Sequence, residues 1–360
     1  MSAAGQRDLS LDSFRGLDVL LMILVNVQGN SDRAYPMLVH AEWDGLTFAD
    51  LVFPIFLLIV GLSTPLAVDR PGAVVSWSSV LRRSALLFAV GVGLSLMIRP
   101  TLDPDMIRWT GVLQRIAIVY LVCAAVVIFR RGFGLAIGLS IVLLAAHSWM
   151  LMQVAPPGGT PSMGPGLGIS GWLDQNFIPG RVLRKTWEPE GLLSTLPAIA
   201  NGLIGVAVMR WQRSRGYGPF SVALVGAALL AAGVIVSGIL PINKNLWTAS
   251  FTLVTCGIGL LTWTFLRAVW PAIGQGILAR WTVSMGQAAL TLYVVHTVLI
   301  AVIVRKLPDD RTIWAVSYEA LTNLTGLSPA ASSLLYAIIA AALSCVLLVF
   351  LKRRGWVLKV

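Results

Sequence analysis

The 360-residue sequence contains little charge and very little cysteine or histidine. Only 12% of its residues are charged, about half the share that is usual in soluble domains, whereas 57% are hydrophobic. The mean hydropathy is +0.81. This composition excludes an ordinary soluble enzyme, and so much apolar sequence also excludes a disordered chain. The sequence therefore predicts an all-α polytopic membrane protein.

The three cysteines, Cys123, Cys256 and Cys345, all fall inside apolar runs. Their spacing gives neither a disulfide framework nor a metal site, so we expect small core residues and no metal. The net charge is +11, but no basic cluster is interleaved with aromatic residues. We therefore expect a lipid bilayer and no nucleic acid as the partner.

Apolar stretches between charged or Pro- and Gly-rich segments predict about ten transmembrane helices in a single domain, residues 1–360. The ten stretches are residues 13–30, 48–68, 80–98, 110–129, 133–153, 191–210, 219–240, 246–266, 281–304 and 329–351. The hydrophilic segment 154–190 is expected to be a functional loop between the fifth and sixth helices. No internal repeat is visible, so the sequence does not support an inverted-repeat transporter.

The distribution of charge predicts the orientation of the bundle. With the N-terminus in the cytoplasm, the inner segments contain 16 basic and three acidic residues, and the outer segments contain 10 basic and 11 acidic residues. Because Lys and Arg gather on the cytoplasmic side, we expect both termini there and segment 154–190 outside. The inner arginines suit lipid head groups or a phosphate-rich cofactor: Arg15, Arg82, Arg83, Arg130 and Arg131.

Several polar side chains fall inside the predicted helices, where their burial is costly. They are Asp18, Asn26, Asp50, Gln114, Arg115, His147 and His296. One interpretation is a structural pair such as Asp18–Arg115 that fixes helix register. The other is that polar groups from separate helices converge on a site. We expect His296 to be a packing histidine rather than a second catalytic group.

Three outer segments carry candidate chemistry. His40 lies beside Glu42 and Asp44 before the second predicted helix, and histidine is the usual general base near neutral pH. The motif WEPEG supplies an aromatic ring and two carboxylates that suit a cationic or hydroxylated ligand: Trp187, Glu188 and Glu190. The motif PINKNLW supplies two amides and a lysine: Asn243, Lys244 and Asn245. Helix capping and interfacial anchoring would explain the last two motifs equally well.

Six stretches together resemble the heparan-α-glucosaminide N-acetyltransferase family, the lysosomal transmembrane acetyltransferases and their bacterial relatives. They are LSLDSFRGLDVLLMILVN, HAEWDGLTFADLVFPIFLLIVG, GVLQRIAIVY, WEPEGLLSTLPAIANGLIGV, PINKNLWTASFTL and MGQAALTLYVVH. They occur in the same order along nearly the whole chain. The resemblance implies an enzyme that transfers acetyl from cytosolic acetyl-CoA to an amino sugar across the membrane, and it suggests a homodimer.

The resemblance also implies roles for individual residues. His40 matches the catalytic histidine of the family, and Asn26 and Asp50 match its asparagine and aspartate. Asp44 stands where the family usually has Asn, and the long outer domain of the lysosomal members is absent. We therefore expect a free or short amino sugar, of the glucosamine type, at the bacterial inner membrane rather than a heparan end group.

These residues predict a mechanism in which His40 deprotonates the acceptor amine. Asp50 or Asp44 would orient the imidazole, and Asn26 would donate a hydrogen bond to the oxyanion. The expected substrate contacts are Asp44, Trp187, Glu188, Glu190, Asn243, Lys244 and Asn245, and the expected cofactor contacts are Arg15, Arg83, Gln114 and Arg115. An acetyl-His40 intermediate, an amino-sugar transporter and an O-acyltransferase for envelope glycans are the alternatives.

Overall fold

The computed structural model describes residues 8–69, 75–129 and 132–358, so Arg130 and Arg131 of the predicted inner rim lie outside the described residues. Within these ranges the chain forms 13 α-helices and no β-strand. The helices are α1 (Leu9–Asn26), α2 (Phe48–Val68), α3 (Trp77–Ile98), α4 (Val112–Phe129), α5 (Gly134–Gln153), α6 (Gly168–Phe177), α7 (Leu192–Arg215), α8 (Pro219–Val236), α9 (Ala249–Ile273), α10 (Ile277–Gln287), α11 (Ala289–Ile303), α12 (Ile313–Thr325) and α13 (Pro329–Arg353). Short 3-10 turns are η1 (Ser31–Arg33), η2 (Pro36–Leu38) and η3 (Pro104–Met106).

Eight of the described helices are long and apolar enough to cross a membrane, namely α2, α3, α4, α5, α7, α8, α9 and α13. The protein is therefore a polytopic helical membrane protein, as predicted. All ten predicted segments are helical, but the ninth is two helices, α10 and α11, that meet at an angle of 81°. The first, α1, carries three charged residues: Asp12, Arg15 and Asp18.

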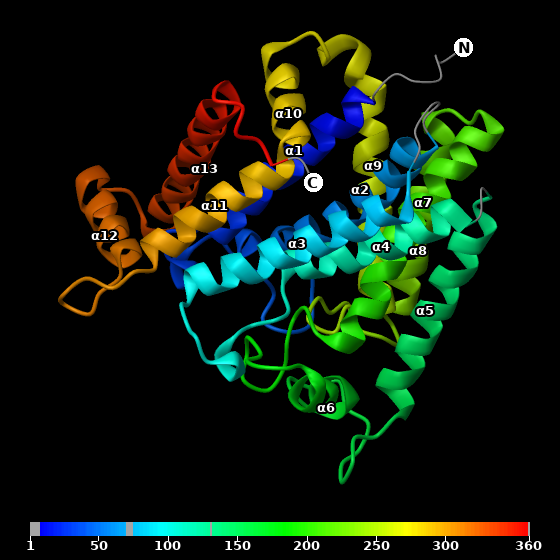
Figure 1. The fold of residues 1–360 in the computed structure, drawn as a ribbon, viewed down its shortest axis with the longest axis horizontal. Helices are drawn as coiled ribbons and strands as arrows, with labels where there is room; N and C mark the ends of the chain where they lie inside the picture. The colour runs from blue at the N-terminus through cyan, green and yellow to red at the C-terminus, as the bar shows by residue number, and fades with distance from the viewer. Residues whose placement is uncertain (1–7, 70–74, 130–131, 359–360) are drawn as a thin grey trace.

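The helices α2, α7 and α9 are the most deeply buried spans, whereas α3 and α8 are largely exposed. Figure 1 shows α3 on the near side of the bundle. Glycine allows α2 and α7 to touch through their backbones. A Cβ atom on Gly61 would lie only 1.9 Å from the carbonyl oxygen of Gly202. This contact fixes α7 against the helix that begins beside His40. The cysteines Cys123, Cys256 and Cys345 are buried, as expected.

The break between α10 and α11 lies against the N-terminal part of α1. A Cβ atom on Gly286 would lie 1.8 Å from the carbonyl oxygen of Asp12, so the two backbones are in direct contact. Arg15 donates to Asp12 (3.0 Å) and to the backbone oxygen of Gly286 (3.4 Å). Asp12 and Arg15 thus contact the residues beside the bend, which the predicted single helix over 281–304 did not anticipate.

The long connections gather at one end of the bundle, together with α6, at the bottom of Figure 1. We call this the loop end, made of segments 27–47, 99–111, 154–191 and 237–248. Isolated backbone bridges hold these segments together, between Asp44 and Asn243 and between Arg108 and Gly180. The start of α2 and the end of α5 also lie here. The loop end therefore brings together the three outer segments that the sequence singled out.

Candidate active site

Asp50 is held rigidly in the first turn of α2. Its Oδ2 accepts hydrogen bonds from the backbone N–H groups of Ala41 (3.1 Å) and Thr47 (3.0 Å) and from the Thr47 hydroxyl (3.0 Å). This is a capping box, because the carboxylate three residues inside the helix satisfies the N–H of the capping residue. The side chain is fully buried. Asp50 therefore presents its other oxygen, Oδ1, in a fixed direction.

His40 contacts Oδ1 of Asp50. Its Nδ1 is 2.9 Å from Oδ1 of Asp50, and because an ionised carboxylate only accepts, this contact places the ring proton on Nδ1. The imidazole side chain is 44% exposed. Nε2 is thus left as the proton acceptor of the ring. A carboxylate that orients a histidine in this way is the arrangement of a catalytic triad.

Lys244 completes this group, which we call the His40 cluster (His40, Asp50 and Lys244). Its Nζ lies 3.1 Å from Nε2 and 2.9 Å from Nδ1 of His40, and 3.5 Å from Oδ1 of Asp50. The side chain is 17% exposed. Burial lowers the pKa of Lys244, although the charges of Asp50 and Glu190 oppose this effect. The structure thus places a predicted substrate contact directly on the predicted base.

The PINKNLW turn is fixed to the segment of His40. Asn243 is fully buried and its Nδ2 donates to Oδ1 of Asp44 (3.0 Å), while its Oδ1 accepts the N–H of Leu246 (2.8 Å). The N–H of Gly45 donates to the carbonyl of Ile242 (2.8 Å). Asp44 therefore holds the turn rather than His40, whereas Asn245 is partly exposed beside Lys244.

Glu188 and Glu190 form a second group with Arg108, which we call the Arg108 cluster. Arg108 donates to both oxygens of Glu188, through Nε at 3.1 Å and through Nη2, and Nη2 also donates to Glu190 (2.6 Å). The Glu188 side chain is completely buried, and that of Glu190 is 11% exposed. Glu188 also accepts the N–H of Leu183 (2.8 Å). Most of the hydrogen-bonding capacity of Glu188 is therefore used within the protein.

The pKa values of the ionisable groups in and beside the Arg108 cluster are shifted in directions that depend on burial and on nearby charges. Burial alone would raise the pKa of Glu190, but the charges of Arg108 and Arg115 hold it below its usual value. Burial raises the pKa of Asp174 to about 6, although its carboxylate accepts the N–H groups of Glu188 (3.1 Å) and Leu192 (3.0 Å). The pKa of Arg108 is raised, because Glu190 and Glu188 outweigh its burial. The segment before α7 is thus fastened by ionised groups.

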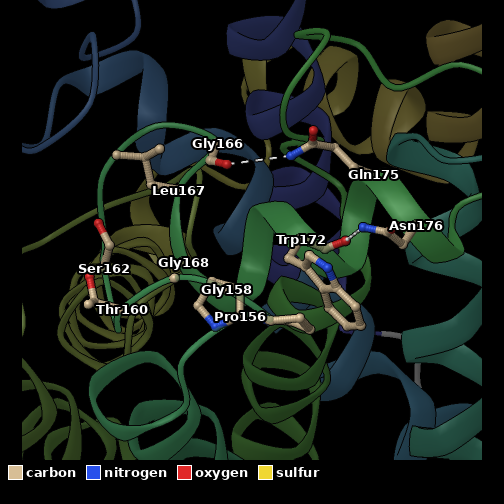
Figure 2. Close-up of a pocket in the computed structure, with 12 residues that line it drawn as sticks. Pro156, Gly158, Thr160, Ser162, Gly166, Leu167, Gly168, Trp172, Gln175 and Asn176 are labelled. Atoms are coloured by element: carbon tan, nitrogen blue, oxygen red, sulfur yellow. Dashed lines mark hydrogen bonds between the residues drawn. The ribbon is translucent and has the colours of Figure 1, made fainter.

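Two tryptophans connect segment 154–190 to the His40 segment. The rings of Trp43 and Trp187 meet edge to face at 5.3 Å, and Nε1 of Trp43 donates to the carbonyl of Met163 (2.9 Å). Nε1 of Trp187 is buried without a partner among the described residues. Beside Met163 the same segment encloses a pocket of about 420 Å³, with Trp172 in its wall (Figure 2). Segment 154–190 is therefore part of the surroundings of the site.

The predicted cofactor residues lie at two positions along the long axis of the bundle, one at the loop end and one deeper in the bundle. Gln114 and Arg115 are buried at the loop end, and Arg115 donates to Ser194 (2.6 Å) and the carbonyl of Gly191 (3.2 Å). Arg15 donates to Ser63 (2.5 Å), which lies 13 residues beyond Asp50 on α2, about 20 Å along the helix. Arg83 stacks on Tyr120, with 4.5 Å between the guanidinium carbon and the ring centre.

Buried donors without a protein partner occur at the loop end. They are Nε2 of Gln114 and Nε and Nη1 of Arg115, none of which has a hydrogen-bond partner among the described residues. A ligand or water that accepts hydrogen bonds would satisfy them. The proposed Asp18–Arg115 pair does not form, because Arg115 bonds to α7 and its approach.

Among the described residues, no hydrogen bond or ion pair joins the remaining predicted residues to the His40 cluster. Asn26 is exposed at the end of α1, and its predicted role stays a prediction. His296 is buried in α11 with its ring 4.9 Å from that of Tyr293, and its Nδ1 has no hydrogen-bond partner among the described residues, so its role stays a prediction. His147 is fully buried in α5.

Sequence reasoning missed Arg108, Asp174 and Thr47. The pattern Thr47-x-x-Asp50 is a recognisable capping signal and could have placed Asp50 in a helix start. No sequence signal connects Arg108 to Glu188 across 80 residues. Only the folded chain shows that this arginine binds both WEPEG carboxylates.

Fold and site together define a polytopic helical membrane protein with a histidine–carboxylate pair at one end of its bundle. A family model described as "Heparan-alpha-glucosaminide N-acetyltransferase, catalytic" matches residues 7–236. The chain belongs to this family, which confirms the assignment made from the sequence motifs. The match contains His40, Asp50 and the WEPEG motif, whereas Lys244 lies beyond it.

Curated relatives support the assignment. The chain is 26% identical over 373 aligned positions to the human protein named "Heparan-alpha-glucosaminide N-acetyltransferase", with 83% of this chain and 54% of that protein covered. It is 27% identical over 359 positions to the mouse protein of the same name, with 80% and 53% covered. The chain spans about half the length of the curated relatives it matches.

Proposed function

We propose that this chain, as a single domain of residues 1–360, is a transmembrane N-acetyltransferase. It transfers acetyl from cytosolic acetyl-CoA to the amine of a glucosamine-type sugar, with His40 as the general base. The observation that carries this proposal is the contact between His40 and Asp50, because it holds Nδ1 and leaves Nε2 to accept a proton. Membership of the family supports the same reaction class.

The acceptor amine arrives as an ammonium ion, which cannot attack a thioester. Nε2 of His40 takes one of its protons, while Asp50 stabilises the imidazolium that results. The neutral nitrogen then forms a C–N bond with the acetyl carbon and the C–S bond breaks. His40 passes its proton to the departing thiolate, and the second proton that the nitrogen loses goes to water. Asn26 is proposed to donate to the oxyanion, a contact worth about 3 kcal/mol in comparable enzymes.

The acceptor site is proposed to lie in front of His40 at the loop end. Trp187 and Glu190 border it from the WEPEG side, where Glu188 holds Arg108. The PINKNLW turn and Asp44 border it from the other side. A carboxylate and an aromatic ring suit a ligand that carries both an ammonium group and hydroxyl groups.

Acetyl-CoA is proposed to lie along the bundle. Gln114 and Arg115 supply buried donors near the His40 end, and Arg15 and Arg83 supply positive charge deeper in the bundle. The separation of about 20 Å along α2 suits an elongated, negatively charged molecule better than a compact one. We place the loop end outside a bacterial inner membrane and both termini inside, and we propose a homodimer.

The test is acetyl transfer from labelled acetyl-CoA to glucosamine by the purified full chain and by His40→Ala. We expect the variant to lose about 100-fold or more of the rate while still binding acetyl-CoA. Equal rates would remove His40 from the mechanism. Transfer to N-acetylglucosamine but not to glucosamine would indicate O-acylation instead, and acetyl-CoA-independent sugar uptake into vesicles would indicate transport.

A further inference from the structure

Lys244 occupies an unusual position for a lysine. It is the amine that contacts the proposed base, with Nζ 3.1 Å from Nε2 of His40 and 3.5 Å from Oδ1 of Asp50. The proposed reaction requires an ammonium group at hydrogen-bond distance from Nε2, so that a proton can be removed from it. Lys244 meets this requirement from within the chain.

We propose that Nζ of Lys244 takes the place of the acceptor amine when no acceptor is bound, and that acetyl-CoA then acetylates Lys244. This inference rests on the proposed function, because it uses the same base and the same acetyl donor. It adds a modification site and a means by which the enzyme switches itself off.

The backbone around Lys244 is rigid enough to hold the amine in this position. Its neighbour Asn243 is fully buried and bonded on both ends of its amide, to Asp44 and to the N–H of Leu246. The N–H of Trp247 donates to the carbonyl of Lys244 itself (3.1 Å). Lys244 can therefore leave His40 by rotation of its own side chain, without unfolding of the turn.

The charged groups around Lys244 come from several elements. Asp50 at the start of α2 and Glu190 before α7 attract its ammonium form, whereas Arg184 repels it. His40 is the direct neighbour. Burial outweighs the attraction and lowers the pKa of Lys244, so a larger fraction of the amine is neutral near physiological pH than for an exposed lysine. A neutral amine is the form that attacks a thioester.

The chemistry balances without any further reactant. Starting from the neutral amine of Lys244, Nε2 of His40 removes a proton from Nζ, Nζ forms a C–N bond with the acetyl carbon, and the C–S bond breaks. The proton passes from His40 to the thiolate of coenzyme A. The product is a neutral amide on Lys244 beside His40, and it cannot release its acetyl group to a sugar. Activity towards the acceptor should therefore fall as the modification accumulates.

The other lysines provide internal controls. The chain contains Lys185, Lys244, Lys306, Lys352 and Lys359. The Lys306 side chain is 64% exposed and pairs with Asp310 (2.6 Å), and Lys352 donates to the hydroxyl of Ser284 (2.6 Å). Non-enzymatic acetylation would favour an exposed lysine such as Lys306. Acetylation by the site would favour the less exposed Lys244.

The experiment incubates the purified full chain with acetyl-CoA and no acceptor, and maps acetyl groups by peptide mass spectrometry. We expect acetyl on Lys244 ahead of Lys306, with a loss of acceptor activity in proportion. Excess glucosamine should prevent the modification, whereas N-acetylglucosamine, which has no amine, should not. The label should survive hydroxylamine, which distinguishes an amide from acetyl-histidine.

Three variants test the assignment. His40→Ala should lower labelling of Lys244 about 100-fold, and His40→Gln repeats the test if the alanine variant folds poorly. Lys244→Arg should abolish the label at this position and the time-dependent inactivation. Lys306→Arg should leave both unchanged. An unlabelled Lys244 in protein that acetylates glucosamine would overturn this inference alone. Absence of transfer to both amines would overturn the proposed function as well.

Discussion

The His40 cluster and the Arg108 cluster lie at the same end of the bundle and are built from similar side chains. In the Arg108 cluster, the buried carboxylate of Glu188 accepts from Arg108 through both oxygens and from the backbone as well. In the His40 cluster, the carboxylate of Asp50 is equally buried, but the imidazole that it holds is 44% exposed. The carboxylates of the first cluster are held in buried ion pairs, whereas the carboxylate of the second holds a partly exposed imidazole.

This difference separates structural from chemical polar residues. A buried carboxylate with all its lone pairs in use stabilises the loop that contains it and offers little to a ligand. A buried carboxylate that fixes a half-exposed base prepares that base for proton transfer. The Arg108 cluster is therefore proposed to shape the acceptor site, and the His40 cluster to carry out the chemistry.

Removal of Arg108 should have the largest effect and should fall on stability. Arg108→Met leaves the carboxylates of Glu188 and Glu190 buried without their cation, which costs about 3–5 kcal/mol of unfolding free energy. His40→Ala should cost less, about 1–3 kcal/mol, because Asp50 loses one hydrogen-bond donor but keeps Lys244 beside the same oxygen. Thermal unfolding of both variants in detergent gives the comparison.

Arg108→Lys is the matched control, because it keeps the charge but loses the paired geometry that binds Glu188. It should fall between the wild type and Arg108→Met. If Arg108→Met were as stable as the wild type, the ion pairs would not fasten the segment before α7.

Most of the fold could be predicted from the sequence, because a membrane span is set by length and apolarity alone. The predicted range 48–68 coincides with α2. The bend at Ala288 could not be predicted, because residues 281–304 contain no charged residue to interrupt a span, whereas in the fold Gly286 packs against α1 just before the break. The hydropathy of a segment indicates how long its apolar stretch is, but it does not indicate which helices the segment packs against.

The ionisation of Asp174 should make the stability of the protein depend on pH, and this effect should be smaller than the loss of Arg108. Its pKa in the folded protein is raised to about 6, so its protonated form favours folding. This contribution is present below about pH 4 and is lost as the pH rises through 6, with a limit of about 3 kcal/mol. Glu190 affects stability in the opposite direction. Its pKa is lowered, so its contribution to stability is lost as the pH falls below the ordinary pKa range of a glutamate.

Asp174→Asn isolates the contribution of Asp174 to the pH dependence of stability, since asparagine does not ionise and keeps one acceptor for a backbone N–H. The stability of the wild type relative to Asp174→Asn should fall between pH 4 and pH 7 in thermal unfolding. A difference that stays constant over this range would mean that Asp174 remains ionised throughout.

The candidate site was only partly predictable for a similar reason. Residue type and spacing singled out His40, Asp50 and Lys244 separately, but they did not show that Lys244 reaches His40 across 204 residues. The same reasoning treated Glu188 and Glu190 as equal ligand contacts. In the structure Glu188 is completely buried and Glu190 is 11% exposed, and both bind Arg108, which no local pattern connects to them.

Asp44→Asn should have the smallest effect and tests the edge of the acceptor site. Asparagine keeps an oxygen for Nδ2 of Asn243, so the turn should stay fixed and stability should change by less than about 1 kcal/mol. The lost negative charge is exposed, and such a charge attracts a cationic acceptor by about 0.2–1 kcal/mol. KM for glucosamine should therefore rise about two- to five-fold, with kcat unchanged and less of a rise at high salt. A fall in kcat instead would place Asp44 with the His40 cluster, as the carboxylate that orients the base.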